Sequence, residues 1–172
     1  MTSWSTIRHK IGKGLNDPAL INYGDKVKTA FSMQYRKFIL EAKPEELEIK
    51  RSEQSISVNS GIGEYTIPLS VVFLSITEKD EIRLIPVTPD KFMNARNNTY
   101  LAPQSNEVMY YKDNNTLRFL TNRAQKGFVI YVQYVADFDF DKGTSMSEVA
   151  VSTVIEETIN LLAGRYERSK AD

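Results

Sequence analysis

The chain has 172 residues, no cysteine, and 22 basic residues that balance 22 acidic ones to a formal net charge of zero. This length favours one domain with a core of useful size, and the missing cysteines exclude disulfides, thiolate metal sites and a cysteine nucleophile. Zero net charge gives no support to nucleic-acid binding by the chain as a whole.

Two amphipathic helices are expected in the first 44 residues. Residues 3–13 place Trp4, Ile7 and Ile11 on one face. A second helix is expected over residues 25–42, where Asp25 is the predicted N-cap and a Lys-Pro step follows the last turn. Basic residues dominate this part of the chain, so it is expected to carry a positive surface.

The hydrophobic period then changes from helical to strand-like. The pattern predicts a β region that contains one short helix over residues 89–97, with Thr88 as its N-cap and Pro89 in its first turn. Asn-Ser-Gly at residues 59–61 predicts a turn. The expected strands cover residues 46–58, 64–67, 71–77, 81–87, 108–112, 116–121 and 128–136.

The strongest helical pattern covers residues 145–168. Ser145 and Glu148 match a capping box, in which each side chain bonds a free backbone N–H at the helix start. Apolar residues follow at steps of three and four, so they share one face. That face requires a partner, which the second helix is expected to supply.

These elements predict an α+β fold in one domain, residues 1–172. Residues 1–44 and 145–172 are expected to form a small bundle of terminal amphipathic helices. Residues 45–144 are expected to form a β-rich insertion between them, as an antiparallel sheet or sandwich.

Little of the chain suits catalysis. His9 is the only histidine and has no carboxylate at helical spacing, so no enzyme activity and no cofactor are expected. The weak metal candidate is the acidic loop, whose carboxylates Asp137, Asp139 and Asp141 precede Glu148 at the twelfth position of a calcium-loop pattern. Its glycine is misplaced and a strand precedes it, so the favoured interpretation is an acidic loop with its phenylalanines packed beneath it.

The order of elements resembles the head-to-tail adaptor (connector) proteins of short-tailed phages, the tail tubular protein A type. A basic N-terminal helix leads to a helix that begins after Tyr-Gly-Asp at residues 23–25. A Tyr-x-Ile-Pro step at residues 65–68 stands where the family commonly has Tyr-x-Leu-Pro. The strands at residues 71–76, 116–120 and 129–134 then precede an acidic loop and a long closing helix.

The resemblance implies a structural virion protein that forms a homo-oligomeric, dodecameric ring below the portal protein and joins the capsid to the tail. A downstream tail ring or nozzle protein would bind its other side, and genomic DNA would pass through the channel without sequence specificity. The expected location is the virion tail or neck, after synthesis in the host bacterial cytoplasm, with no membrane contact. The candidate portal or subunit interface residues are Lys26, Lys28, Arg36, Arg165, Tyr166, Arg168 and Lys170.

Three alternatives remain open from the sequence. The first is another phage tail ring or stopper component with the same plan. The second is a small cation-dependent or nucleic-acid-processing enzyme built around the acidic loop, which a calcium or magnesium dependence of stability, abolished by Asp139→Ala and Asp141→Ala, would support. The third is a monomeric cytoplasmic binding module.

Overall fold

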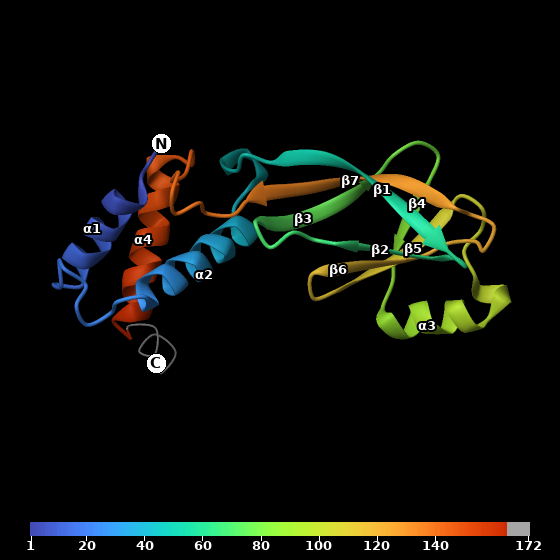
Figure 1. The fold of residues 1–172 in the computed structure, drawn as a ribbon, viewed down its shortest axis with the longest axis horizontal. Helices are drawn as coiled ribbons and strands as arrows, with labels where there is room; N and C mark the ends of the chain where they lie inside the picture. Colours follow the sequence, from blue (N-terminus) through green and yellow to red (C-terminus); the bar gives the residue numbers. More distant parts are fainter. Residues whose placement is uncertain (165–172) are drawn as a thin grey trace. The chain divides into compact units, whose positions relative to one another are not determined.

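The computed structural model describes residues 1–164. Within them the chain forms two compact units (Figure 1). Of the described residues, 1–49 and 135–164 form the helical unit, and 50–134 form the sheet unit. The prediction that the whole chain is a single domain stays a prediction.

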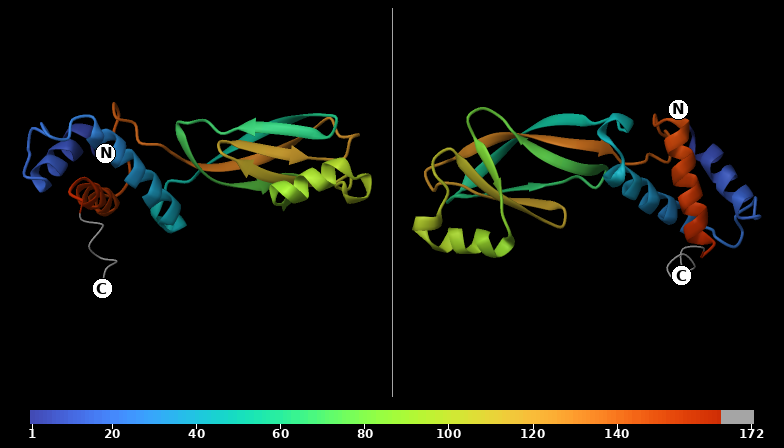
Figure 2. Two further views of the ribbon diagram at one scale, coloured as in Figure 1. Left: turned by 90° about the horizontal axis from the view of Figure 1, so that it is seen from below. Right: turned by 180° about the vertical axis from the view of Figure 1, so that it is seen from behind.

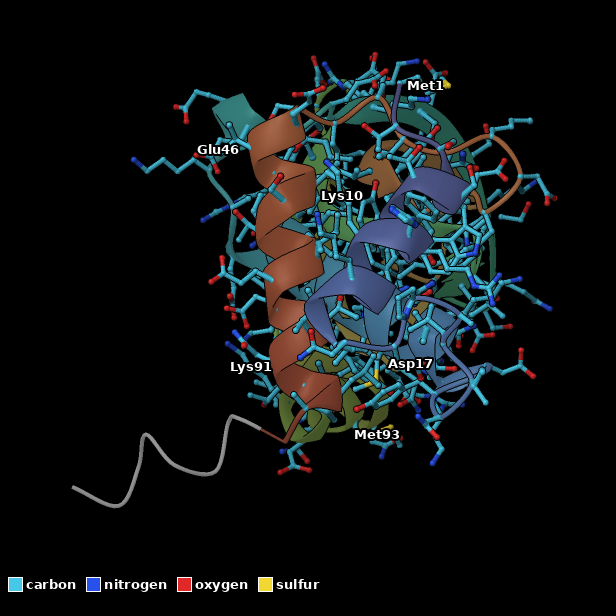
Figure 3. All side chains as sticks on the ribbon, turned by 90° about the vertical axis from the view of Figure 1, so that its left-hand side faces the viewer. Met1, Lys10, Asp17, Glu46, Lys91 and Met93 are labelled. Atoms are coloured by element: carbon cyan, nitrogen blue, oxygen red, sulfur yellow. The ribbon has the colours of Figure 1, made fainter. Side chains whose placement is uncertain are left out.

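The helical unit contains α1 (Trp4–Gly14), α2 (Lys26–Glu41), α4 (Glu148–Leu162) and the short 3-10 helix η1 (Pro44–Glu46). Helix α4 contacts both α1 and α2, and these helices lie side by side in Figures 2 and 3. The buried faces follow the helical spacing of the apolar residues. Their fully buried side chains include Ile7, Ile11, Phe31 and Val154.

Aromatic rings fill the space between α1, α2 and the loop before α4. The Phe31 ring centroid lies 5.4 Å from that of Trp4 and 4.9 Å from that of Phe138. Phe140 meets Trp4 edge-on at 4.7 Å. Such tilted and edge-on pairs add to the stability gained from burial alone. Phe138 therefore belongs to the core of this unit, and the partly buried Phe140 packs against its edge.

The ends of α4 differ from the sequence prediction. Its N-cap is Ser147, whose side chain accepts a hydrogen bond from the N–H of Ala150 at 3.2 Å. The predicted capping box is wrong, because the Ser145 hydroxyl donates to Glu48 at 2.6 Å instead. The helix ends at Leu162 and not at residue 168, since Gly164 takes the left-handed conformation that ends many helices.

A β-bridge ties the N-terminus to the loop before α4. Thr2 and Thr144 exchange backbone hydrogen bonds of 3.0 and 3.2 Å. The neighbouring Gly143 has a φ of 81°, and a β-carbon there would overlap the carbonyl oxygen of Thr2. Only glycine fits both the left-handed backbone and the close approach.

Gly143→Ala is therefore expected to lower the free energy of unfolding by at least about 2 kcal/mol. Gly24→Ala is the matched control, because Gly24 also has positive φ but has open space around its Cα. It should cost only about 1 kcal/mol, the left-handed penalty alone. Urea unfolding of both variants measures the difference, and equal losses would contradict the steric argument.

The sheet unit is built on one seven-stranded sheet with the order β3-β7-β1-β2-β6-β5-β4. Most of the recorded neighbours are antiparallel, but β4 and β5 run parallel. A crossover joins this pair, as parallel strands require, and it contains α3 (Pro89–Asn97) and the 3-10 helix η2 (Thr99–Leu101) (Figure 1). The strands are β1 (Lys50–Asn59), β2 (Ile62–Thr66), β3 (Val71–Glu78), β4 (Arg83–Pro86), β5 (Glu107–Asp113), β6 (Thr116–Leu120) and β7 (Gly127–Ala136).

The predicted fold class is wrong. Residues 1–164 form a mixed α/β fold with one mixed sheet and four α-helices, not a terminal helical bundle with an antiparallel β insertion. The parallel β4–β5 pair and the crossover through α3 overturn the antiparallel sheet or sandwich. The physical reason is that the chain between β4 and β5 contains α3. This long connection lets the chain return to the start of β4 and run beside it in the same direction as β5.

The core of the sheet unit is apolar and consists of a main cluster and a smaller one. Phe119 lies at its centre, fully buried, with its ring centroid 5.2 Å from that of Phe128. A smaller cluster joins Phe92 and Ala95 of α3 to Leu120 of β6. This cluster fixes the position of α3 against the sheet.

Candidate binding site

The basic residues predicted on α2 have different environments. Lys26 and Lys28 are exposed, and the Lys28 ammonium lies 5.3 Å from the centroid of the Phe140 ring. Arg36 forms an ion pair with Asp137, with its Nε 2.9 Å from Oδ2. Arg36 therefore already has a carboxylate partner within the helical unit. The other predicted interface residues, Arg165, Tyr166, Arg168 and Lys170, lie outside the described residues.

The acidic loop uses its carboxylates within the chain. Asp139 accepts hydrogen bonds from the backbone N–H groups of Asp141 and Lys142 at 2.9 and 3.1 Å. These bonds hold the pKa of Asp139 below its ordinary value. Glu148 lies exposed in the first turn of α4. Within residues 1–164 no group of three or more acidic or histidine side chains is arranged to hold a metal ion.

A recess in the sheet unit has a volume of about 840 Å³. It lies between the β1–β2 turn, the last turn of α3, the loop after η2, and the end of β6. Its size falls within the range of about 300–1,000 Å³ that ligand sites occupy. We call it the α3 pocket. Its polar side chains include Arg96, Asn97, Gln104, Thr121, Asn122 and Arg123.

Local folding rules bring these segments together. The β1–β2 hairpin turns at Ser60 and Gly61, both with positive φ, as a tight hairpin requires. Gly61 O accepts a hydrogen bond from the N–H of Thr121 at 2.8 Å, which fixes the end of β6 beside the turn. Phe92 of α3 packs edge-on against Tyr111 of β5, with their ring centroids 4.9 Å apart. This contact holds α3 against the sheet, and residues 95–97 of its last turn line the recess.

The charge of the α3 pocket is one-sided. Its lining contains Arg96 and Arg123 and no acidic residue. Neither guanidinium has a salt bridge or hydrogen bond recorded to another residue of the described chain. At its edge, in η2, Tyr100 is 98% exposed and Leu101 is 51% exposed. The pocket therefore combines two free cations with an exposed aromatic and an exposed aliphatic side chain.

The sequence did not reveal this pocket. It predicted the hairpin turn and the helix over residues 89–97, but it indicated no binding residue in the segments 97–106 and 123–127. Arg96 and Arg123 are 27 positions apart in the sequence. They line the same pocket because the crossover through α3 brings the chain back to β5, parallel to β4. The available signal was the Thr88-Pro89 helix start between two strand patterns, which is typical of a crossover.

Searches against protein-family models and against curated proteins both return no match for this chain. None of the helices in residues 1–164 combines the length and the apolar character needed to cross a membrane.

Proposed function

We propose that the protein is a structural component of a short-tailed phage virion, an adaptor that assembles as a ring between the portal and the tail. Its function is carried by contacts and not by catalysis. Support comes from the order of elements along the chain, from the basic N-terminal helix to the acidic loop and closing helix. DNA would pass through the ring without sequence-specific contacts.

The observation that carries this proposal is an exposed apolar face on α2. Met33 is 59% exposed and Leu40 is 64% exposed. They stand seven positions apart, two helical turns, so they share one face. Val149 on α4 adds a third exposed apolar side chain to the same unit. Covering such side chains stabilises an interface by about 1.5–3 kcal/mol each when burial is complete.

A closed ring is a suitable way to cover that face. A heterologous contact places one surface of each subunit against a different surface of its neighbour, and it closes when the rotation between subunits completes a circle. Every copy then buries its α2 face. Lys26 and Lys28, exposed near the start of the same helix, would set the register against acidic residues of the neighbour.

Met33→Glu combined with Leu40→Glu is expected to abolish assembly on the portal ring, because two charges would have to be buried without partners. The variant should keep the melting temperature of the wild type, since both side chains are exposed. Met93→Glu on α3 is the matched control, because Met93 is 44% exposed but belongs to the sheet unit. Sedimentation with the portal ring measures assembly, and a double variant that assembles like the wild type would contradict the proposal.

A monomeric binding module is the second candidate function, and the α3 pocket is the observation that favours it. This candidate would be supported if the protein stays monomeric when it is mixed with the portal ring and with other virion rings, but binds a ligand in this pocket.

A further inference from the structure

From the α3 pocket we infer a docking site for an acidic, extended peptide segment of a partner protein. The inference stands on the pocket alone and does not require the adaptor function. The occupant is expected to place carboxylates on Arg96 and Arg123, with its backbone along the amide side chains between them.

The cations indicate a carboxylate ligand. An arginine guanidinium binds a carboxylate through two parallel hydrogen bonds, which fixes both position and orientation. Arg96 and Arg123 approach the recess from two different elements, α3 and the turn after β6. No acidic lining residue competes for them. Two carboxylates on one short segment would therefore find two separate partners.

The amide groups indicate a peptide backbone. Asn97, Gln104 and Asn122 all line the pocket, and each amide carries both donors and an acceptor. Asn122 accepts a hydrogen bond from the N–H of Ala124 through its Oδ1 at 3.0 Å, and its NH₂ group remains a donor. A peptide supplies alternating N–H and C=O groups that match such side chains.

The lining disfavours nucleic acid. Single-stranded nucleic acids bind on platforms of several aromatic rings, whereas no aromatic residue lines the pocket and Tyr100 at its edge supplies a single ring. The helix end at the pocket is the C-terminal one, since Ala95, Arg96 and Asn97 close α3. The last carbonyl groups of that end can accept hydrogen bonds from peptide N–H groups, which a phosphate does not carry.

The edge of the pocket has the composition of a protein interface. Tyrosine and arginine are the residues that most often dominate binding energy between proteins. Tyr100 is almost fully exposed beside the lining residue Thr99, and Leu101 follows it. The apolar floor, which includes Ile62 and Leu120, can receive an aliphatic side chain of the segment.

The test is a titration of the full-length ¹⁵N-labelled protein with the acidic peptide acetyl-GEVTELEG-amide, to millimolar concentration. The side-chain NH₂ signals of Asn97, Gln104 and Asn122 should shift, and the shift should weaken with salt. Arg96→Ala and Arg123→Ala should each weaken binding by at least about tenfold. Lys91→Ala, which removes one exposed charge from the first turn of α3, should leave binding unchanged.

Two controls make the inference falsifiable. The neutral peptide acetyl-GQVTQLQG-amide should bind at least about tenfold more weakly than the acidic one, because it lacks the carboxylates. Equal binding of both peptides, or no shift with the acidic peptide, would overturn the inference. Shifts caused by an oligothymidylate and not by the peptide would also overturn it, in favour of nucleic acid. Both arginines are exposed, so thermal melts should show every variant folded.

Discussion

Phe31→Ala is expected to lower the free energy of unfolding of the helical unit by about 3–5 kcal/mol. Phe31 is fully buried on α2, and its ring contacts those of Trp4, Tyr35 and Phe138. The alanine would leave a cavity where helices and loop meet, and it would remove several aromatic pairs at once.

The chain supplies its own reporter for this variant. Trp4 is the only tryptophan, and its ring centroid lies 5.4 Å from that of Phe31. Its fluorescence therefore follows unfolding of the helical unit. Urea unfolding measures the loss. Met33→Ala is the matched control on the same helix, because its exposed side chain should change stability by less than about 0.5 kcal/mol. A loss below about 1 kcal/mol for Phe31→Ala would contradict the described packing.

Phe119→Ala is expected to lower the free energy of unfolding of the sheet unit by about 3–5 kcal/mol. Phe119 is fully buried on β6, and its ring centroid lies 5.2 Å from that of Phe128 and 6.3 Å from that of Tyr110. Leu117 and Ile130 are buried in the same cluster, so the alanine would leave a cavity among packed apolar side chains.

The strand signal in far-ultraviolet circular dichroism, followed through urea unfolding, measures the loss in the sheet unit. Tyr100→Ala is the matched control, since it removes an aromatic ring of the same unit that is almost fully exposed. Its effect should stay within about 0.5 kcal/mol. Similar losses for the two variants would show that Phe119 does not occupy the core.

Local patterns predicted the elements well. The helix over residues 89–97 has the predicted bounds, because Thr88 accepts the N–H of Lys91 at 3.3 Å and Pro89 needs no partner for a missing N–H. The hairpin turn formed where glycine permits positive φ. Each of these signals depends on residues a few positions apart, so the sequence displays it directly.

Contacts between distant residues were not predictable in the same way. Ser145 matches the capping-box pattern, but its hydroxyl donates a hydrogen bond to the carboxylate of Glu48, which is 97 positions away in the sequence. Strand β1 pairs antiparallel with β7, in a register that places Lys50 opposite Tyr134, and β4 pairs in parallel with β5. Hydrophobic period identifies a strand but does not specify which strand lies beside it. The fold class failed for this reason.

The candidate site failed for the same reason. The arginine pair of the α3 pocket depends on the crossover through α3, which brings residues 96 and 123 to one recess. The acidic loop, in contrast, shows its role locally, since Asp139 bonds the backbone two and three residues ahead. Its phenylalanines pack beneath it as the sequence predicted.

The most direct test of the proposed adaptor function is the mass of the portal ring of the encoding phage, with and without this protein, by native mass spectrometry. The proposal predicts an added mass of about one copy for each portal subunit, as expected when both rings share the same rotational symmetry. The Met33→Glu, Leu40→Glu variant should add nothing. A portal ring whose mass does not change when the wild-type protein is present in excess would contradict direct contact between the two.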